Sequence, residues 1–479
     1  MYGIHLDKSS SLSATRQLCQ QLRLLIESGQ LAAGTRLLPT RVLAKEWGIA
    51  RNVVVEVYEQ LTAEGYLDCR VGSGTYVAAG IRTHSGIQPD LPPTEAPVPQ
   101  KEAVSGPEVI DFATGIPDLA SFPGTIWAKY LREAAETLAV AESGYGDIRG
   151  FRTLRCAIRD FLFRAKGIRC TTEQILIVSG ASEGIFLTAL SLSPGFHSLY
   201  LEDPTISFAR DIFRKMNYNL VPVEVDQQGM NLGLLSRFAP GHLVLLTPSH
   251  QFPSGSLLSI QRRQQAIRMA EEADSFILED DYDSEFRLKG IPVPPMQTLS
   301  PSRVIYVGTF SKTLSPSLRI GFLIVPPHLM DRIAGTKEEL NMYTPLVLQK
   351  ALARFIVDGQ LERHIHTMKK LYKKRRALLK ERLFALFGNE ISILGDDAGM
   401  HLQVCFRSDC YARLPWKNTD SYGFRLELAS DYSIAETTEK PGGIILGYGN
   451  LTAGEIVEGV ARIHTFVSES GLSSAQTPQ

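Results

Sequence analysis

Hydrophobic positions change their spacing along the chain, and the change separates two kinds of element. From Thr15 to Gly29 the apolar residues, Leu18 and Leu22 among them, recur at helical spacing. Beyond residue 109 the pattern consists of short, continuous β-branched and aliphatic runs that alternate with helical patterns. Such alternation is typical of a mostly parallel sheet covered by helices on both faces. The sequence therefore predicts a small helical module followed by a larger α/β body.

The first module, residues 1–78, is predicted to be a winged helix. A short helix begins at Thr40, Gly48 breaks it within a tight turn, and a further helix begins near Arg51 and ends at Gly65. Two strand-like runs, 66–70 and 75–77, then flank a glycine-rich turn. A helix-turn-helix followed by a hairpin is the order of elements in a winged helix.

Side chains of this module suit double-stranded DNA. Arg51 and Asn52, at the start of the third helix, are placed to reach base edges. Arg41 and Arg70 would neutralise phosphates. In the wing, Gly72 and Gly74 let the backbone approach a groove. Charges through residue 80 are nearly balanced, eight Lys/Arg against seven Asp/Glu. A helical protein-interaction domain is therefore the alternative.

Composition defines the remaining segments. Residues 79–108 are rich in proline and poor in large apolar side chains, so we expect a semi-stiff linker there. The main body is assigned to 109–468, and 469–479 are expected to be a disordered tail.

The overall charge and the cysteines exclude several classes of protein. The net charge is −1, so any nucleic-acid footprint must be local. Six scattered cysteines without metal-like spacing predict reduced thiols and no metal site. The chain shows neither a signal-peptide pattern nor an apolar run long enough to span a membrane. We expect a cytoplasmic protein without membrane contact.

The stretch that follows the strand-like run 304–307 carries the candidate chemistry. Thr309, Ser311, Lys312 and Arg319 lie just beyond the end of this run, and ligands of α/β sheets bind at that edge. Hydroxyls and a guanidinium suit a phosphate. Burial can lower the pKa of Lys312 and leave a neutral amine able to form a Schiff base. The alternative is a solvated loop lysine.

Two other strand ends carry groups that fit the same ligand. The sequence 179–182 opens a helix whose backbone N–H groups can hold a phosphate, although simple helix capping would also explain it. Asp280 ends a buried strand, where a carboxylate would pair with a protonated pyridine nitrogen, and Tyr282 would lie on the other side of the ring. Together with Lys312 these groups predict a pyridoxal phosphate site.

Motifs in both parts resemble known families. GTRLLPTRVLA, GIARNVVVEVYEQLTAEGY and VGSGTYV resemble the GntR-type winged helix, with Ala50 where that family usually has a capping serine. Loss of such a cap costs about 1 kcal/mol. SGASEG, LEDP, TPSHQFPSG, EDDYDSEF and GTFSK occur in the order of fold-type I aminotransferase domains, which implies a smaller C-terminal α/β domain as well. The chain is similar to the MocR subfamily of GntR regulators, which fuse the two.

The resemblance implies a role for each matching residue. Lys312 would form the internal aldimine, Asp280 would pair with the ring nitrogen, and Tyr282 would bond the ring hydroxyl. The residues implied to hold the phosphate are Ala181, Ser182, Thr309, Ser311 and Arg319. Tyr145 would reach the phosphate of the partner subunit, so a head-to-tail homodimer is expected.

Several departures from aminotransferases favour a sensor over an enzyme. Phe252 replaces an asparagine that bonds the ring hydroxyl, Ile206 replaces a stacking aromatic residue, and Asp431 stands where an arginine usually clamps a carboxylate. Arg210 and Arg425 remain as candidate effector-binding residues.

The sequence thus leads to one main functional hypothesis and two alternatives. The main hypothesis is a DNA-binding transcription regulator that senses an amine or amino-acid-like effector through aldimine exchange at Lys312. The alternatives are an active aminotransferase and a regulator that senses pyridoxal phosphate itself.

Overall fold

The computed structural model separates into two compact units, Met1–Ser105 and Gly106–Gln479. It describes residues 2–4, 6–7, 12–70, 72–81, 109–140, 144–290, 293–408, 410–411, 414–434 and 443–474. The predicted linker, 79–108, lies outside the described residues from 82 onward.

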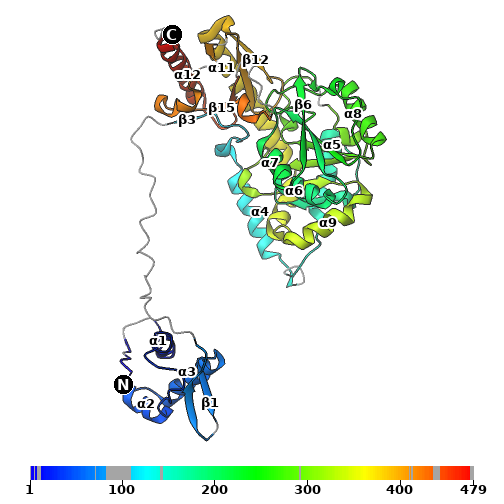
Figure 1. Cartoon of the computed structure of the whole chain (residues 1–479). Coiled ribbons are helices and arrows are strands. Elements are labelled where there is room, and N and C mark those ends of the chain that lie inside the picture. The colour runs from blue at the N-terminus through cyan, green and yellow to red at the C-terminus, as the bar shows by residue number, and fades with distance from the viewer. Residues whose placement is uncertain are drawn as a thin grey trace. The chain divides into compact units, whose positions relative to one another are not determined.

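The first unit has the order of elements of a winged helix (Figure 1). Its elements are α1 (Ala14–Glu27), α2 (Thr40–Trp47), α3 (Arg51–Ala63), β1 (Leu67–Arg70) and β2 (Gly74–Val77). The strands form an antiparallel hairpin in which Leu67 pairs with Val77 and Arg70 with Gly74. Leu22, Leu43 and Leu61, one from each helix, are fully buried in a common core. The helical spacing of the apolar residues therefore positions the three helices.

The N-termini of α2 and α3 lack side-chain caps. Pro39 rather than Thr40 precedes α2, and Thr40 is the first helical residue, so its hydroxyl does not cap the helix. Ala50 precedes α3 and offers no oxygen to the backbone N–H groups of the first turn. The third helix thus begins without the hydrogen bond that the capping serine supplies in similar sequences.

The second unit is built around an eight-stranded mixed sheet. In spatial order the strands are β4 (Ile175–Val178), β11 (Gly321–Ile324), β10 (Val304–Thr309), β9 (Phe276–Asp281), β8 (His242–Leu246), β5 (Ser198–Asp203), β6 (Asn219–Asp226) and β7 (Gly229–Met230). The strands from β10 to β6 are parallel, whereas β11 runs antiparallel to both of its neighbours. The prediction of a mostly parallel sheet is confirmed.

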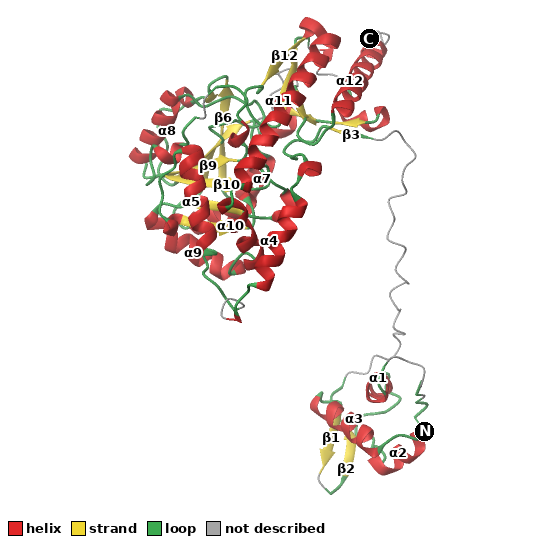
Figure 2. Ribbon diagram, turned by 180° about the vertical axis from the view of Figure 1, so that it is seen from behind, coloured by secondary structure: helices red, strands yellow, loops and turns green. Residues whose placement is uncertain are grey.

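Successive residues of the strands pack against different helices, because side chains alternate between the faces of a sheet. Ile305 and Val307 of β10 share a core with α6 (Ala181–Leu192), α7 (Ser207–Lys215) and α9 (Pro327–Asn341). Tyr306 of the same strand belongs to the core that includes α5 (Arg152–Lys166) and α10 (Leu346–Val357). Near the other edge of the sheet, α8 (Ile260–Glu272) completes the cover, and Figure 2 shows helices on both sides of the strands.

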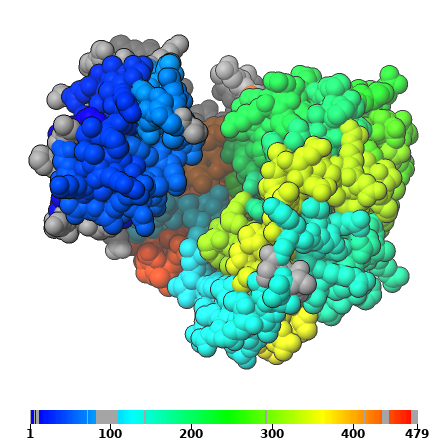
Figure 3. All heavy atoms as spheres, turned by 90° about the horizontal axis from the view of Figure 1, so that it is seen from below, coloured from blue at the N-terminus to red at the C-terminus, as the bar shows by residue number. Residues whose placement is uncertain are grey.

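Two helices far apart in the sequence lie side by side on the outside of this unit. The atoms of α4 (Gly124–Glu136), cyan, adjoin those of α10, yellow (Figure 3). Trp127 packs edge-on against Phe355 with ring centroids 5.9 Å apart. The Tyr130 hydroxyl donates to Asp358 at 2.7 Å. These contacts fix α4 to the helical layer.

A smaller sheet and two long helices form the C-terminal part. The sheet has the order β12 (Ile391–Leu394), β13 (His401–Phe406), β16 (Ile444–Gly447) and β15 (Glu427–Leu428), flanked by α11 (Gln360–Phe387) and α12 (Ala453–Ser474). In addition, β14 (Phe424–Arg425) pairs with β3 (Ile110–Asp111) and ties the start of the unit to its end. α12 ends at Ser474, and Ile463, Phe466 and Val467 are buried along it. The disordered tail expected at 469–479 stays a prediction, and residues 475–479 lie outside the described residues.

No helix within the described residues has both the length and the apolar character needed to cross a membrane.

Candidate functional site

A cavity of about 440 Å³ lies at the carboxyl ends of β9 and β10. Eight of the predicted cofactor-binding residues line it together: Ala181, Ser182, Asp280, Tyr282, Thr309, Ser311, Lys312 and Arg319. They come from the ends of two parallel strands and from the first turn of α6, which meet at this edge of the sheet. The hydrophobic runs of the sequence thus place distant polar residues in one cavity.

Lys312 is a largely buried amine. Its Nζ donates to the carbonyl oxygen of Gly115 at 2.7 Å. Burial lowers the pKa of Lys312, while the negative charges of Asp283 and Asp280 partly oppose this effect. A Cβ on Gly115 would lie 2.4 Å from Nζ, so the amine occupies the place that any larger side chain would need. The setting favours a neutral, nucleophilic amine.

Asp280 fits the ring nitrogen of a pyridine. Its carboxylate is 3% exposed, and Oδ1 has no hydrogen-bond partner among the described residues. Burial first, and then the charge of Asp281, raises the pKa of Asp280 to about 7 against the opposing effect of Lys312. A buried carboxylate oxygen without a donor is costly. A protonated pyridine nitrogen would supply both the donor and the counter-charge.

The phosphate-binding residues form a pocket of donors at the N-terminus of α6. Gly180 precedes this helix with φ of +92°, and a Cβ there would come within 3.0 Å of the Arg319 guanidinium. Nη2 of Arg319 donates to the carbonyl oxygen of Ser179 at 2.6 Å and to the hydroxyl of Ser182 at 3.1 Å. Thr309 Oγ1 donates to Ser311 Oγ at 3.0 Å. Backbone N–H groups, hydroxyls and one guanidinium therefore converge where a phosphate would bind. The cavity fits pyridoxal phosphate by donor set and by the unpartnered Asp280 oxygen.

Tyr282 belongs to a buried network that the sequence did not predict. Its hydroxyl donates to the carbonyl oxygen of His250 at 2.9 Å and lies 3.1 Å from His250 Nδ1. The same ring nitrogen is 3.0 Å from Asp283 Oδ1. His401 stacks at an angle on His250 with ring centroids 4.9 Å apart, and burial, followed by the charge of His250, lowers the pKa of His401 to about 3. The network orients the phenol at the wall of the cavity.

Three side chains of this network also meet a purely geometric condition for a metal ion. The ligand atoms of His250, Asp283 and His401 lie within 4.8 Å of one another. The histidine and aspartate already satisfy each other by the hydrogen bond above, so we interpret the group as an orienting network. The expectation that the chain has no metal site stays a prediction.

The end of the cavity nearest the C-terminal part carries acceptors instead of an arginine. Tyr432 lines the cavity, and its hydroxyl donates to Glu427 Oε2 at 2.8 Å. Thr114 donates to the same oxygen at 2.7 Å. Asp431 is exposed to solvent. Phe252 and Ile206, the two replacements noted in the sequence, both line the cavity.

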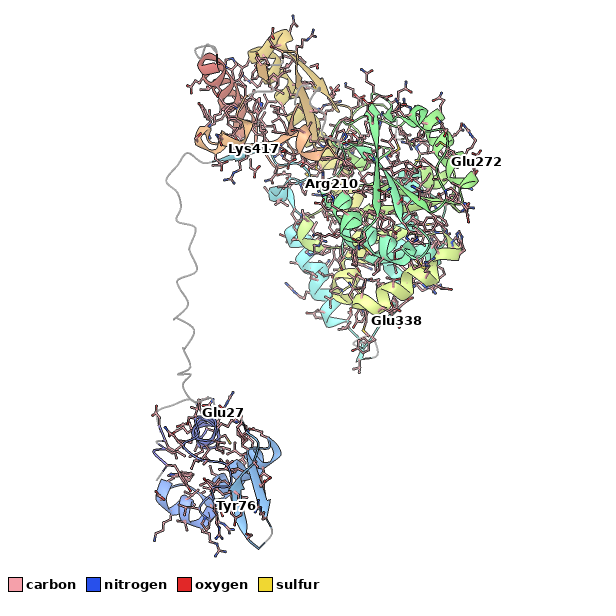
Figure 4. The ribbon with its side chains drawn as sticks, in the orientation of Figure 1. Glu27, Tyr76, Arg210, Glu272, Glu338 and Lys417 are labelled. Atoms are coloured by element: carbon pink, nitrogen blue, oxygen red, sulfur yellow. The ribbon has the colours of Figure 1, made fainter. Side chains whose placement is uncertain are left out.

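Three predicted site residues do not line this cavity. Arg210 lies on α7, where Figure 4 labels it, and its Nε pairs with Asp211 at 3.1 Å. Arg425 makes a two-pronged ion pair with Asp420 on the surface. Tyr145 is 82% exposed and touches Tyr343 edge-on at 6.1 Å. In this chain neither arginine lines the cavity, so their role in effector binding stays a prediction, as does the contact of Tyr145 with a partner subunit.

The predicted DNA contacts lie on the surface of the first unit. Arg41, Arg51, Asn52 and Arg70 are exposed. Nε of Arg51 donates to Thr40 Oγ1 at 3.4 Å, and the Arg70 guanidinium lies 4.8 Å from the centre of the Tyr76 ring. Gly72 and Gly74 have φ of +77° and +119° in the wing, conformations that favour glycine. The sequence pattern did not single out Arg36. Its guanidinium lies beside Gly74, 3.0 Å from the position that a Cβ would take there, and so adds a cation next to the wing.

Family models match both units of the chain. The model "Bacterial regulatory proteins, gntR family" matches residues 14–77. The model "Aminotransferase class I and II" matches residues 107–419 and therefore most of the second unit. Aminotransferases of this class generally bind pyridoxal phosphate.

Relatives share the whole arrangement. The chain is 34% identical over 473 residues to the "Probable rhizopine catabolism regulatory protein MocR" of Rhizobium meliloti, covering 95% of this chain and 94% of that protein. It is 30% identical over 450 residues to the pyridoxine biosynthesis transcriptional regulator PdxR of Corynebacterium glutamicum, covering 93% and 94%. Among solved structures, a multiple substrate aminotransferase from Thermococcus profundus superposes with a TM-score of 0.70 at 25% identity, covering 78% of this chain and 94% of that one. The chain belongs to the gntR family of bacterial transcription regulators, in the MocR group, which joins a DNA-binding winged helix to an aminotransferase-like domain.

Proposed function

We propose that this regulator binds pyridoxal phosphate at Lys312 and that reaction with an amine effector there changes its affinity for operator DNA. The observation that carries the proposal is the placement of a buried, largely desolvated amine and an unpartnered carboxylate oxygen in one cavity. Bound pyridoxal phosphate would supply an electrophilic carbon that exchanges one amine for another.

Each residue of the cavity has a part in this proposal. Asp280 would hold the ring nitrogen in its protonated form, and the donors around Ser182 and Arg319 would hold the phosphate. Lys312, once displaced by an effector amine, would be a free amine able to donate to the carbonyl oxygen of Gly115. The contacts of Lys312 would differ between the effector-free and the effector-bound state. This difference in contacts would allow an effector to shift the conformation.

The lining of the cavity favours an effector without a carboxylate clamp. Its cationic side chains in this chain are Lys312 and Arg319, and Arg319 belongs to the phosphate-binding group. Burial keeps His401 neutral near neutral pH, since its pKa is lowered to about 3. At the far end, Glu427 presents a carboxylate held by two hydroxyls. We therefore propose a primary amine, and a diamine in preference to an α-amino acid.

The proposal includes a homodimer. Tyr145 is a large aromatic residue that is exposed and lies outside its own chain's cavity. A second subunit placed head to tail would bring this phenol to the phosphate of its partner, as the resemblance to aminotransferases implies.

The decisive test compares Lys312→Ala with Lys417→Ala, an exposed lysine outside the cavity. We expect only the first variant to lose the visible absorbance of the bound cofactor and the response of operator binding to amines. The operator would be obtained by selection from random duplexes with the wild-type protein. Amine-dependent DNA binding that survives in Lys312→Ala would refute the proposal.

The same preparation separates the two alternatives. Steady turnover of an amino acid with a keto acid would identify an aminotransferase. A change of operator affinity on titration with pyridoxal phosphate, without any amine, would identify the cofactor as the signal.

A further inference from the structure

A second cavity, of about 510 Å³, lies on the opposite side of the end of β9 from the cofactor cavity. Five segments line it: the C-terminal part of α5, the loops after β8 and β9, the first turns of α11, and the loop between β12 and β13. Asp280 lines the cofactor cavity, whereas the next residue, Asp281, bonds Lys166 in the wall of the second cavity. The two cavities therefore share one strand end as a partition.

The walls of the second cavity contain polar atoms that are buried and lack partners among the described residues. They are the hydroxyl of Ser249, which is 8% exposed as a residue, Nε of Arg287 and Oε2 of Glu362. One of these atoms is a donor, one an acceptor, and the hydroxyl can serve as either. Buried polar groups are nearly always hydrogen-bonded to protein or to ordered water, so this unpartnered set offers hydrogen bonds to the molecule that fills the cavity.

Two cations of the cavity lining have no carboxylate partner among the described residues. Lys166 is already neutralised, since its Nζ bonds Asp281 at 2.8 Å and Glu285 at 2.7 Å. Glu362 is engaged through Oε1 by Arg164 at 2.6 Å. In contrast, no carboxylate within the described ranges lies at salt-bridge distance from Arg287 or Lys369, both of which line the cavity. An anion would balance them.

We propose that this second cavity binds a small oxyanion, a carboxylate or a phosphate, that also carries a hydroxyl group. Arg287 and Lys369 would hold the anionic group, and Ser249 would donate to it. The unpartnered Oε2 of Glu362 would accept from the hydroxyl of the ligand. Against the opposing effect of burial, the carboxylates of Asp281 and Glu285 raise the pKa of Lys166, so this lysine stays protonated and does not act as a nucleophile.

A ligand there would act on the cofactor cavity through two short loops. Ser249 adjoins His250, which bonds Tyr282 and Asp283 in the wall of the cofactor cavity. Ser284 and Glu285 line the second cavity and directly follow Asp283. The second site is therefore placed to adjust the orientation of the Tyr282 phenol, whether or not an amine is the effector.

The test is calorimetric titration of the full chain, loaded with pyridoxal phosphate, with two probes: malate as the carboxylate and inorganic phosphate as the phosphate. We expect at least one probe to bind saturably. Arg287→Gln and Lys369→Gln should each weaken that binding by about tenfold, the usual effect of losing a charged hydrogen bond. The matched controls, Arg268→Gln on α8 and Lys370→Gln beside Lys369, change the same charge outside the cavity and should leave the affinity within about twofold.

Arg319→Gln distinguishes binding at the phosphate group of the cofactor cavity from binding at the second cavity. Loss of probe binding in this variant alone would overturn the proposal, and so would the absence of saturable binding of both probes. Circular dichroism verifies that each variant is folded, and Lys369→Gln, on the partly exposed side of α11, provides the test if Arg287→Gln does not fold. Failure of cofactor attachment at Lys312 would leave this result unaffected.

Discussion

The cofactor-free protein is destabilised by its own Asp280, and the size of this effect follows from its pKa. Burial first, and then the charge of Asp281, raises that pKa from 3.8 to about 7. The folded state therefore binds the proton more tightly than the unfolded state does. The contribution of Asp280 to the free energy of unfolding is fully present below its pKa in the unfolded state. It is lost as the pH rises through its pKa in the folded state. At about 1.4 kcal/mol per pKa unit, the loss reaches about 4 kcal/mol above about pH 7.

Asp280→Asn replaces the carboxylate by an amide of the same shape that cannot ionise. We expect the cofactor-free variant to be more stable than the wild type by about 2–4 kcal/mol at about pH 8, and by about 1 kcal/mol or less at about pH 4.5. With pyridoxal phosphate the order should reverse, because an amide does not balance a protonated ring nitrogen. Cofactor affinity should therefore fall.

The assay is urea unfolding of the cofactor-free full chain in a Trp47→Phe background. Trp127 and Trp416, both in the second unit, then report its unfolding by fluorescence. The matched control is Asp331→Asn on α9, because this carboxylate is exposed and its replacement removes no buried charge, so stability should be unchanged at both pH values. A stability gain in Asp280→Asn that is equal at both pH values would show that charge burial is not its cause.

Three further predictions concern the winged helix and the dimer. Ala50→Ser should add the missing cap of α3 and stabilise the first unit by about 1 kcal/mol in thermal unfolding, whereas Ala33→Ser in an exposed loop should leave it unchanged. Arg51→Gln should cost about 1–3 kcal/mol of operator-binding free energy and relax the base preference. Arg70→Gln should weaken binding to all DNA sequences alike and reduce the slope of log affinity against log salt concentration by about 1. Both are measured by fluorescence anisotropy, and equal behaviour of the two variants would contradict the assigned roles. Tyr145→Ala should lower the affinity for the cofactor. Mixing the Tyr145→Ala and Lys312→Ala proteins should restore one intact site per heterodimer, as measured by a visible-absorbance titration with the cofactor. No restoration would argue against a site shared between subunits.

Much of the cofactor cavity could be predicted because it depends on where strands end. A run of buried residues such as 304–307 ends at the edge of the sheet, so the polar residues that follow it, Lys312 among them, had to lie there. The same reasoning placed Asp280. Parallel pairing of β9 with β10 then brings the two together without any information beyond the hydrophobic pattern.

The parts that the sequence did not yield depend on contacts between distant segments. The bonds of Tyr282 with His250 and Asp283 arise where the loops after β8 and β9 converge, and no spacing in the chain encodes that. Position along the chain likewise did not show that Arg425 pairs with Asp420 on the surface, because that pairing is a local side-chain choice. The second cavity depends likewise on five separated segments of the chain.

The hydrogen bond between Lys312 and Gly115 has a consequence for communication along the chain. Gly115 lies a few residues after β3, where the chain enters the second unit from the linker, and β3 is held by its pairing with β14. Attachment of Lys312 to the proposed cofactor would take its amine away from the Gly115 carbonyl. Under the proposed function, the first segment of the second unit would therefore respond to the chemical state of the lysine through one backbone oxygen.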